Sequence, residues 1–362
     1  MKIAKYIFLL LLLAIIAFSV YVATQKGDFN IERSRIINAP RSFLFSYVNE
    51  YKNWEKWGTW QQEDPTIKYT YPEKTSGVGG SYTWIGKDGN GKMETVFNKV
   101  NDSIAQRIYL KDIPSDVYWK FKDTVGGTKV TWGMKGEMGF MWKAYAILSG
   151  GVDKMIGPMY EKGLDNLSTV IANELSNFNI QVNGLTLKGG GFYLQQTASC
   201  NIPDLDSKMD PMLVNIINFF KENKIPTAGA PFSIYHVYDT KNNAVTFSVA
   251  IPIVEQIFTT PGSDYTTGEL MEFQALKTTL KGDYSHIQAA WDKANEYMTK
   301  NNLEEVPGGK FLEVYIKGPS DTTSPSEWIT EIYIPVREKI ATPPPVVPVV
   351  PKVKITPPAV TE

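Results

Sequence analysis

Two glutamates in the C-terminal half of the chain stand in segments that predict β-strands. Glu313 lies in the segment Phe311–Lys317, and Tyr315 follows it two residues later. Glu331 and Tyr333 have the same spacing. Because successive side chains of a strand point to opposite faces, each glutamate shares a face with its tyrosine. A carboxylate that faces a cleft is costly to bury without a partner, and a cationic ligand would supply that partner.

The same carboxylates have two other interpretations. With a pKa raised by desolvation, Glu313 would act as a general acid or base, and Tyr315 would orient the bound substrate. Alternatively, each glutamate lies on the solvent face beside a lysine. We favour a functional role for Glu313 and leave both interpretations of Glu331 open. Tyr235 and Tyr238 are further candidates for aromatic residues that line a ligand site.

The composition limits the chemistry that these residues can share. The chain has 362 residues, with 37 lysines and arginines against 38 aspartates and glutamates, two histidines and one cysteine. One cysteine excludes an intrachain disulfide and a zinc site built from cysteines, and two histidines leave few candidates for a histidine-based triad. A net charge of −1 argues against nucleic-acid binding, which depends on neutralising phosphates. We therefore expect no metal, no cofactor and no nucleic acid, and any catalysis would rest on carboxylates and tyrosines.

The N-terminus predicts a membrane anchor over residues 1–28. Residues 6–25 carry no charge and are mostly Leu, Ile, Ala, Val and Phe. A helix of this length spans about 30 Å, which is the thickness of the hydrocarbon core of a bilayer. The apolar run of a signal peptide is shorter, at about 7–15 residues. Since no small-x-small cleavage site is evident either, we favour an uncleaved single-pass helix.

The orientation of that helix and the role of the other terminus are less constrained. Lys2 and Lys5 favour a cytoplasmic N-terminus, whereas basic residues from Lys26 onward weaken the bias. We expect a bacterial inner-membrane protein with its soluble domains on the periplasmic side, and we leave the orientation open. Residues 338–362 are rich in Pro and Val, which predicts an extended, disordered tail. Such a tail is also a candidate binding segment for a protein partner.

The first block between these termini, residues 29–175, has strand, short-helix and long-helix patterns. A strand over residues 29–37 leads through Ala39-Pro40 into a helix over residues 41–49. A second helix over residues 152–174 closes the block, because its apolar residues recur near every 3.6 positions. The strands expected between the two helices are Lys68–Tyr71, Gly80–Ile85, Lys92–Lys99, Ile104–Leu110, Val117–Asp123 and Thr128–Met134.

The segments IERSRIINAPRSFLFSYVNEYKNWEKWGTW and SGVGGSYTWIGKDGNGKMETV resemble the SRPBCC superfamily, which has the START-like or polyketide-cyclase-like helix-grip fold. The resemblance implies a curved antiparallel sheet that grips a long helix, with an apolar cavity between them. It implies no particular reaction, because the superfamily includes cyclases, lipid carriers and chaperone activators. Trp54, Trp57 and Trp60 either line the mouth of that cavity or form a packing cluster, and we favour the cluster.

A polar stretch over residues 176–188 predicts a linker to the second block, residues 189–337, which contains an internal repeat. Ile225-Pro226 corresponds to Val306-Pro307, and Tyr235 corresponds to Tyr315, at offsets of 81 and 80 residues. A duplicated β-α-β-β unit would place two helices on one antiparallel sheet, with a cleft on the pseudo-twofold axis. The expected elements are the strands Phe192–Cys200, Phe232–Tyr238, Val245–Ile253, Met271–Leu280, Phe311–Lys317 and Trp328–Val336 and the helices Pro211–Glu222 and Tyr284–Lys300.

The segments PFSIYHVYD, FSVAIPI and FLEVYIKGPSDTTSPSEWITEIYIPV resemble the GyrI-like effector-binding domain. This resemblance implies a cleft for small, often hydrophobic or cationic molecules, lined by aromatic residues and a buried carboxylate. Through the motif that closes the domain, it implies Glu313 and Tyr315 as the first site residues and Trp328 and Glu331 as the second.

We therefore expect an α+β protein with one transmembrane helix, a helix-grip domain and a duplicated β-α-β-β domain. Its expected function is to bind small apolar, aromatic or cationic molecules. One alternative is a hydrolase of small reactive molecules in which Glu313 activates water and Tyr315 orients the substrate, so the sequence leaves open whether the protein is an enzyme. Another is a scaffold whose clefts are vestigial.

Overall fold

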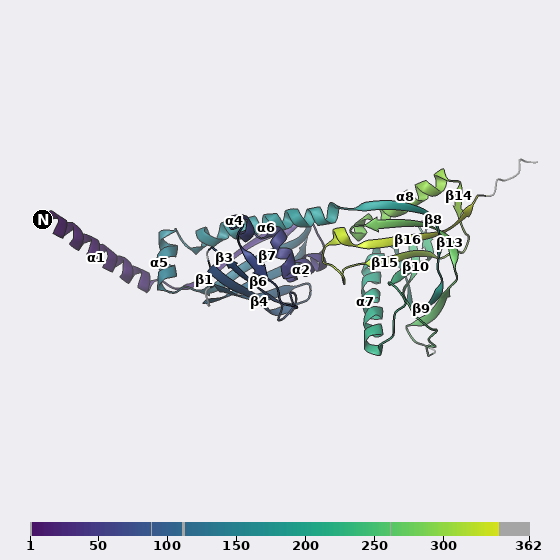
Figure 1. Cartoon of the computed structure of the whole chain (residues 1–362), viewed down its shortest axis with the longest axis horizontal. Coiled ribbons are helices and arrows are strands. Elements are labelled where there is room, and N and C mark those ends of the chain that lie inside the picture. Colours follow the sequence, from purple (N-terminus) through teal and green to yellow (C-terminus); the bar gives the residue numbers. More distant parts are fainter. Residues whose placement is uncertain (1, 88, 111–112, 261, 340–362) are drawn as a thin grey trace, which may run out of the picture. The chain divides into compact units, whose positions relative to one another are not determined.

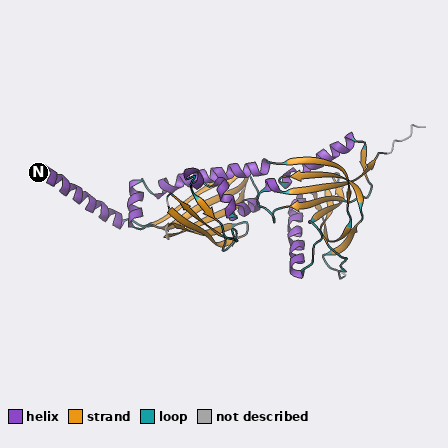
Figure 2. Cartoon of the chain, in the orientation of Figure 1, coloured by secondary structure: helices purple, strands orange, loops and turns teal. Residues whose placement is uncertain are grey.

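The computed structural model of the chain describes residues 2–87, 89–110, 113–260 and 262–339. It has two antiparallel sheets and several helices, which confirms the predicted α+β class (Figures 1 and 2). The predicted Pro-rich tail lies outside the described residues, apart from Glu338 and Lys339.

The chain divides into two compact units, and each contains several stretches of sequence. Unit 1 comprises the described residues up to Ile180, together with Leu280–Gln288 and Tyr315–Thr330. Unit 2 comprises Gln181–Thr279, Ala289–Val314 and the described residues from Glu331 onward. Two short stretches of the predicted second domain, Leu280–Gln288 and Tyr315–Thr330, therefore belong to unit 1, which also contains the predicted first domain.

The first sheet has seven strands in the order β1-β7-β6-β5-β4-β3-β2, and the long helix α6 packs on it. Gly163 of α6 permits the close approach, because a Cβ atom there would lie 2.7 Å from the ring of Trp132. The helices of this part are α1 (Lys2–Thr24), α2 (Arg41–Asn49), α3 (Trp54–Trp57), α4 (Trp60–Glu63), α5 (Phe140–Leu148) and α6 (Val152–Ser176), and a 3₁₀ turn, η1, spans Tyr51–Asn53. The strands are β1 (Asp28–Ile37), β2 (Lys68–Thr70), β3 (Ser81–Gly86), β4 (Gly89–Lys99), β5 (Ser103–Leu110), β6 (Ile113–Thr124) and β7 (Gly127–Glu137).

Helix α1 has the length and composition to cross a bilayer. The stretch Ile3–Thr24 has a mean hydropathy of 2.7, and it is the one helix of this kind among the described residues. Most of its side chains are exposed. These properties agree with the predicted anchor.

The second sheet has the order β12-β9-β11-β10-β15-β16-β13-β8, with β14 paired to β16. The central neighbours β10 and β15 come from the two halves of the predicted repeat. Outward from β10 follow β11 and then β9, and outward from β15 follow β16 and then β13. The strands are β8 (Asn179–Lys188), β9 (Gly191–Asn201), β10 (Phe232–Asp239), β11 (Ala244–Pro252), β12 (Thr266–Leu270), β13 (Phe273–Lys281), β14 (Leu303–Glu305), β15 (Phe311–Lys317) and β16 (Ile329–Glu338). The helices are α7 (Leu205–Asn223) and α8 (Ile287–Lys300), with 3₁₀ turns η2 (Ile202–Asp204), η3 (Tyr284–His286) and η4 (Pro325–Glu327).

The linker expected at residues 176–188 is instead mostly strand β8, at the edge of this sheet. Ile180, Val182 and Thr186 point toward the protein, whereas Leu185 and Leu187 are exposed. Because Ile180 and Val182 lie on the inner face but Leu185 and Leu187 lie on the outer one, the apolar residues of this strand do not keep to one face, and the sequence lacks the alternation that predicts a strand.

Candidate functional site

The strands β10 and β15 bring the predicted site residues of unit 2 together. They pair antiparallel, with Ser233 opposite Glu313 and Tyr235 opposite Phe311. Because these residues occupy alternate positions, all four lie on one face of the sheet. Leu312 and Val314 occupy the other positions of β15 and are buried in the apolar cluster of the opposite face.

Helix α8 adds a residue to this face that the sequence analysis did not identify. Trp291 follows Ala290 on the side of α8 that is packed against the protein, and its indole reaches β15. Glu313 is 3% exposed. Its Oε1 accepts a hydrogen bond from Trp291 Nε1 at 2.7 Å, and its Oε2 accepts one from Tyr235 Oη at 2.9 Å. A buried carboxylate is thus held in place by two donors from different elements.

Both of these donors are uncharged groups, a phenol O–H and an indole N–H. Hydrogen bonds to a charged acceptor are roughly twice as strong as those between neutral groups. An indole N–H can only donate, so Oε1 of Glu313 must act as an acceptor toward Trp291. The two hydrogen bonds fix the position of the Glu313 carboxyl group inside unit 2.

Aromatic rings surround the donors of Glu313. Tyr235 lies edge-on to Trp291, with ring centroids 6.3 Å apart, and at the same distance from Tyr238. Trp291 also lies 6.3 Å from Phe311. Rings attract cations through their faces, so a fixed carboxylate among aromatic side chains suits a cation with an apolar body.

Glu331 lies on the opposite face of the sheet from Glu313. Its neighbour two positions along, Tyr333, packs in the same apolar cluster as Leu312 and Val314. Lys277 Nζ lies 2.7 Å from Oε1 of Glu331, and Tyr333 Oη donates to Oε2 at 2.7 Å. The structure therefore does not bring the two glutamates into one site.

The ion pair with Lys277 determines the charge state of Glu331. Burial by itself raises the pKa of this carboxyl, but the hydrogen bonds from Lys277 and Tyr333 outweigh it, so the pKa lies below its usual range. Burial also lowers the pKa of Lys188, whose ammonium lies 4.9 Å from the centroid of the Tyr333 ring. This face thus carries a carboxylate whose charge is balanced within the protein.

Tyr315 and Trp328 lie in unit 1, where they share one aromatic neighbour. The ring of Tyr284 lies 5.8 Å from that of Tyr315 and 4.8 Å from that of Trp328. Trp328 is buried, and its Nε1 donates to the carbonyl oxygen of Thr322 at 3.0 Å. These three rings flank the segment between β15 and β16.

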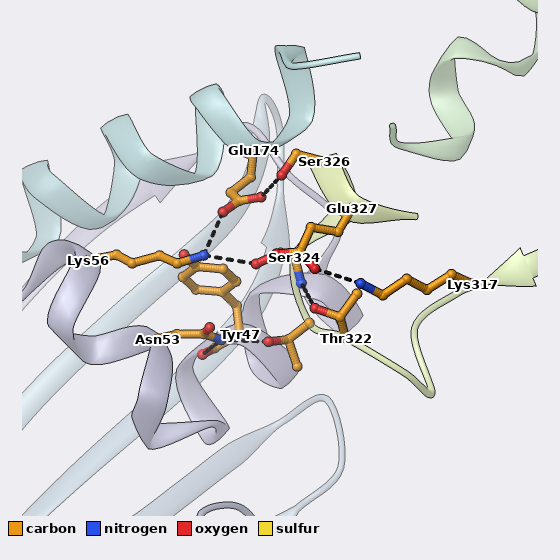
Figure 3. Close-up of polar contacts among 10 residues, drawn as sticks. Tyr47, Asn53, Lys56, Glu174, Lys317, Thr322, Ser324, Ser326 and Glu327 are labelled. Carbon is orange, nitrogen blue, oxygen red and sulfur yellow. Dashed lines mark hydrogen bonds and ion pairs between the residues drawn. The ribbon is translucent and has the colours of Figure 1, made fainter. Parts of the chain in front are cut away.

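That segment is held by a polar network from α3 and α6 within unit 1 (Figure 3). Lys56 Nζ donates to Glu174 Oε1 at 3.0 Å and to Ser324 Oγ at 2.9 Å. Ser326 Oγ donates to the other oxygen of Glu174 at 2.5 Å. Because Ser324 is buried and the Glu174 side chain is only 11% exposed, this contact is better shielded from solvent than an ordinary surface ion pair.

Trp54, Trp57 and Trp60 belong to the aromatic packing between α6 and the first sheet. Trp54 and Trp57 are buried, and Trp60 packs against the same cluster. Each of the three has a ring contact with Trp132, at centroid distances of 5.6–6.1 Å. Trp132 in turn lies 3.9 Å from Tyr160 of α6. Packed rings therefore occupy the place where the helix-grip resemblance implies an apolar cavity, and a role of these tryptophans toward a ligand stays a prediction.

A hollow of about 450 Å³ lies elsewhere in unit 1, over β5 and β6. Among its charged lining residues, Asp116 and Lys120 of β6 occupy positions that alternate with those of the buried Val117 and Trp119, and Arg107 and Lys135 pair with Asp116 from the neighbouring strands. The hollow thus lies on the face of the sheet away from α6. Among the described residues, no group of three or more His, Cys, Asp or Glu side chains is placed to hold a metal ion.

The comparisons with known families agree with this architecture. Residues 28–172 match the model of the family described as polyketide cyclase / dehydrase and lipid transport. Residues 193–337 match that of the GyrI-like small molecule binding domain. The chain therefore carries an SRPBCC domain followed by a GyrI-like domain, which confirms both predicted resemblances. No curated protein matches the chain.

Solved structures are similar to parts of the chain at low identity. The alignment with a cryo-EM structure of EcmrR with DNA has 14% sequence identity and a TM-score of 0.39, and it covers 55% of this chain and 72% of the matched chain. The alignment with the structure of SAV2435 bound to tetraphenylphosphonium has 13% sequence identity and a TM-score of 0.33, and it covers 44% of this chain and 94% of the matched chain. A protein from Rhizobium leguminosarum is 19% identical, covers 41% of this chain and 97% of that chain, and has a TM-score of 0.32.

Proposed function

We propose that the protein is a membrane-anchored binder of small cationic molecules with an aromatic or apolar body, and that Glu313 binds the cation. The observation that carries this proposal is the buried carboxylate of Glu313, held by Tyr235 and Trp291 among further aromatic rings. The match of residues 193–337 to a small molecule binding domain supports it. Helix α1 would supply the anchor.

The energetics of burial favour a cation as the ligand. An ionised carboxylate taken out of water costs several kcal/mol, of which about 1.5–3 kcal/mol is recovered by each hydrogen bond to the charged group. A ligand cation would add a Coulomb attraction and contacts with the ring faces of Tyr235 and Trp291. A matching anion would meet the carboxylate with repulsion, so the site would discriminate by charge.

We assign the ligand to unit 2 rather than to the helix-grip domain. An apolar molecule between α6 and the first sheet would have to displace rings that already pack at van der Waals distances, such as Trp132 and Tyr160. An apolar ligand in the cavity that the helix-grip resemblance implies therefore stays a prediction. Helices α3 and α6 of that domain hold the segment that follows β15, through Lys56 and Glu174.

The binding proposal is tested on the full chain in lipid nanodiscs by equilibrium dialysis with two probes of matched shape. Tetraphenylphosphonium carries a positive charge and tetraphenylborate a negative one, and binding to empty nanodiscs is subtracted. We expect saturable binding of the cation alone. Glu313→Gln should weaken it by about 2 kcal/mol or more, which is about 30-fold, because the charge is removed while the shape is kept.

Glu331→Gln is the matched control, since the same change is made on the other face of the sheet, and it should leave the affinity for the cation unchanged. Equal binding of cation and anion, or equal effects of the two substitutions, would contradict the proposal. The predicted hydrolase uses the same carboxylate. It would require turnover of a reactive substrate that disappears in Glu313→Gln.

A further inference from the structure

Helix α5 exposes an apolar face that the described part of unit 1 leaves open to solvent. Five of its nine residues are large, apolar or aromatic, and between 45% and 76% exposed: Phe140, Met141, Trp142, Tyr145 and Leu148. Its one buried residue is Ala146. Soluble proteins rarely expose a contiguous apolar patch of this kind unless something covers it.

The chain path keeps α5 next to the end of the membrane helix. Helix α1 ends at Thr24 and β1 begins at Asp28, so about 14 Å of extended chain is the most that separates them. Asp28 pairs with Glu137, the last residue of β7, and α5 begins three residues later, at Phe140. Both helices are therefore tied by short segments to one end of the same strand pair.

The end of α1 lies beside α5 (Figure 1), and residues of the two helices are in contact. Lys143 Nζ of α5 donates to the carbonyl oxygen of Gln25 at 3.0 Å, just after α1. Val22, near the end of α1, is 0% exposed, in contrast to most of that helix. Helix α5 is thus fixed at the point where α1 would leave the bilayer.

From this placement we propose that the exposed face of α5 lies in the interfacial layer of the membrane that α1 spans. The inference rests on the anchoring by α1 proposed above. Trp and Tyr are enriched at this depth because their rings are amphipathic, and Trp142 and Tyr145 contact each other on the exposed face, with ring centroids 6.1 Å apart. A helix of nine residues, about 14 Å long, is suited to lie along the interface and too short to cross it.

This second contact would restrict how the helix-grip domain moves on its anchor. A single helix leaves a domain free to rotate about the helix axis. Two contacts at one end of the sheet, α1 in the bilayer and α5 on its surface, would keep that end of β1 and β7 at the membrane.

The test uses the full chain with one fluorescent label in vesicles of phosphatidylcholine and phosphatidylglycerol. Cys200 is the only cysteine, so Cys200→Ser provides the background for Met141→Cys, labelled with an environment-sensitive NBD group. The matched control is Val125→Cys in the same background. Val125 is 96% exposed in the turn before β7, and the eleven residues of β7 place it about 36 Å from the α5 end of that strand.

We expect the label at position 141 to emit at shorter wavelength in vesicles and to lose its emission when nitroxide lipids are added. The label at position 125 should show neither effect. Flotation of the vesicles measures anchoring separately. If the chain floats and the two labels behave alike, the interfacial role of α5 is wrong and the anchoring stands. A blue shift at position 141 without quenching by lipid would indicate a protein partner on α5 and overturn the inference, and a chain that does not float would overturn both proposals.

Discussion

Trp291→Phe removes the indole N–H that donates to Oε1 of Glu313 at 2.7 Å and retains a ring to pack against Phe311 and Tyr235. A hydrogen bond to a charged group contributes about 1.5–3 kcal/mol to stability. We therefore expect the free energy of opening of β15 to fall by at least that amount, with a further loss from the smaller ring. In the Glu313→Gln background the same substitution removes a bond to a neutral group, which is worth about 0.5–1.5 kcal/mol.

Native-state hydrogen exchange of the β15 amides measures these opening free energies in the full chain. The four proteins of the double-mutant cycle should give a coupling of about 1 kcal/mol or more between Trp291 and Glu313. Trp328→Phe is the matched control for the chemical change, because the indole of Trp328 donates to the neutral carbonyl of Thr322 at 3.0 Å. If the coupling is absent, the reasoning on the carboxylate is refuted. It is also refuted if Trp328→Phe lowers the opening free energy of the segment around Thr322 as much as Trp291→Phe lowers that of β15.

Three further predictions concern other contacts. The pKa of Glu331 is lower in the folded state than its usual value of 4.5. The stability that ionised Glu331 contributes is therefore complete above pH 4.5 and is lost as the pH falls through the folded-state pKa. Lys277→Met should reduce this acid dependence, measured as the pH dependence of hydrogen exchange in β16. Asn53→Ala removes the side-chain donor to the carbonyl oxygen of Tyr47 and to Thr323, so it should cost about 1–3 kcal/mol and speed hydrogen exchange in residues 318–328. Lys317→Met, which removes the exposed ion pair with Glu327, should change this exchange little. Trp119→Phe should lower the thermal unfolding midpoint of the first domain more than Trp132→Phe. The reason is that Trp119 Nε1 donates to Gln106 at 3.0 Å, whereas Trp132 Nε1 has no hydrogen-bond partner among the described residues. Equal changes of the midpoint would contradict this prediction.

Local patterns predict the strand that carries the candidate site. The segment Phe311–Lys317 has the bounds of β15, and Glu313 stands out as a charge between Leu312 and Val314. Alternation in a strand is a local property, so it places Glu313 on the face opposite those two residues without further information.

The contact of Trp291 with Glu313 was not predicted, because it depends on how α8 lies on the sheet. Trp291 sits in a polar helix whose buried residues are Ala290, Ala294 and Met298. The large side chain of Trp291 beside these buried residues is a local signal, but it does not indicate which strand the indole reaches. Spacing within a helix carries no information on contacts with a strand twenty residues away.

The two glutamates could not be assigned to different faces from sequence. Glu313 and Glu331 each precede a tyrosine by two positions in a predicted strand. Their faces depend on how β16 pairs within the sheet, and that pairing places Tyr333 with Leu312 and Val314. Lys277, which neutralises Glu331, comes from a third strand, β13, far away in the sequence.

Photo-crosslinking tests the central claim most directly, since it locates the bound cation on the chain. A phosphonium cation with aromatic groups and a diazirine would be irradiated with the full chain in nanodiscs, and the modified peptides identified by mass spectrometry. We predict labelling in β10, in β15 and around Trp291 of α8, suppressed by excess tetraphenylphosphonium and lost in Glu313→Gln. Labelling confined to α1 or to the helix-grip domain, or unaffected by Glu313→Gln, would contradict the account.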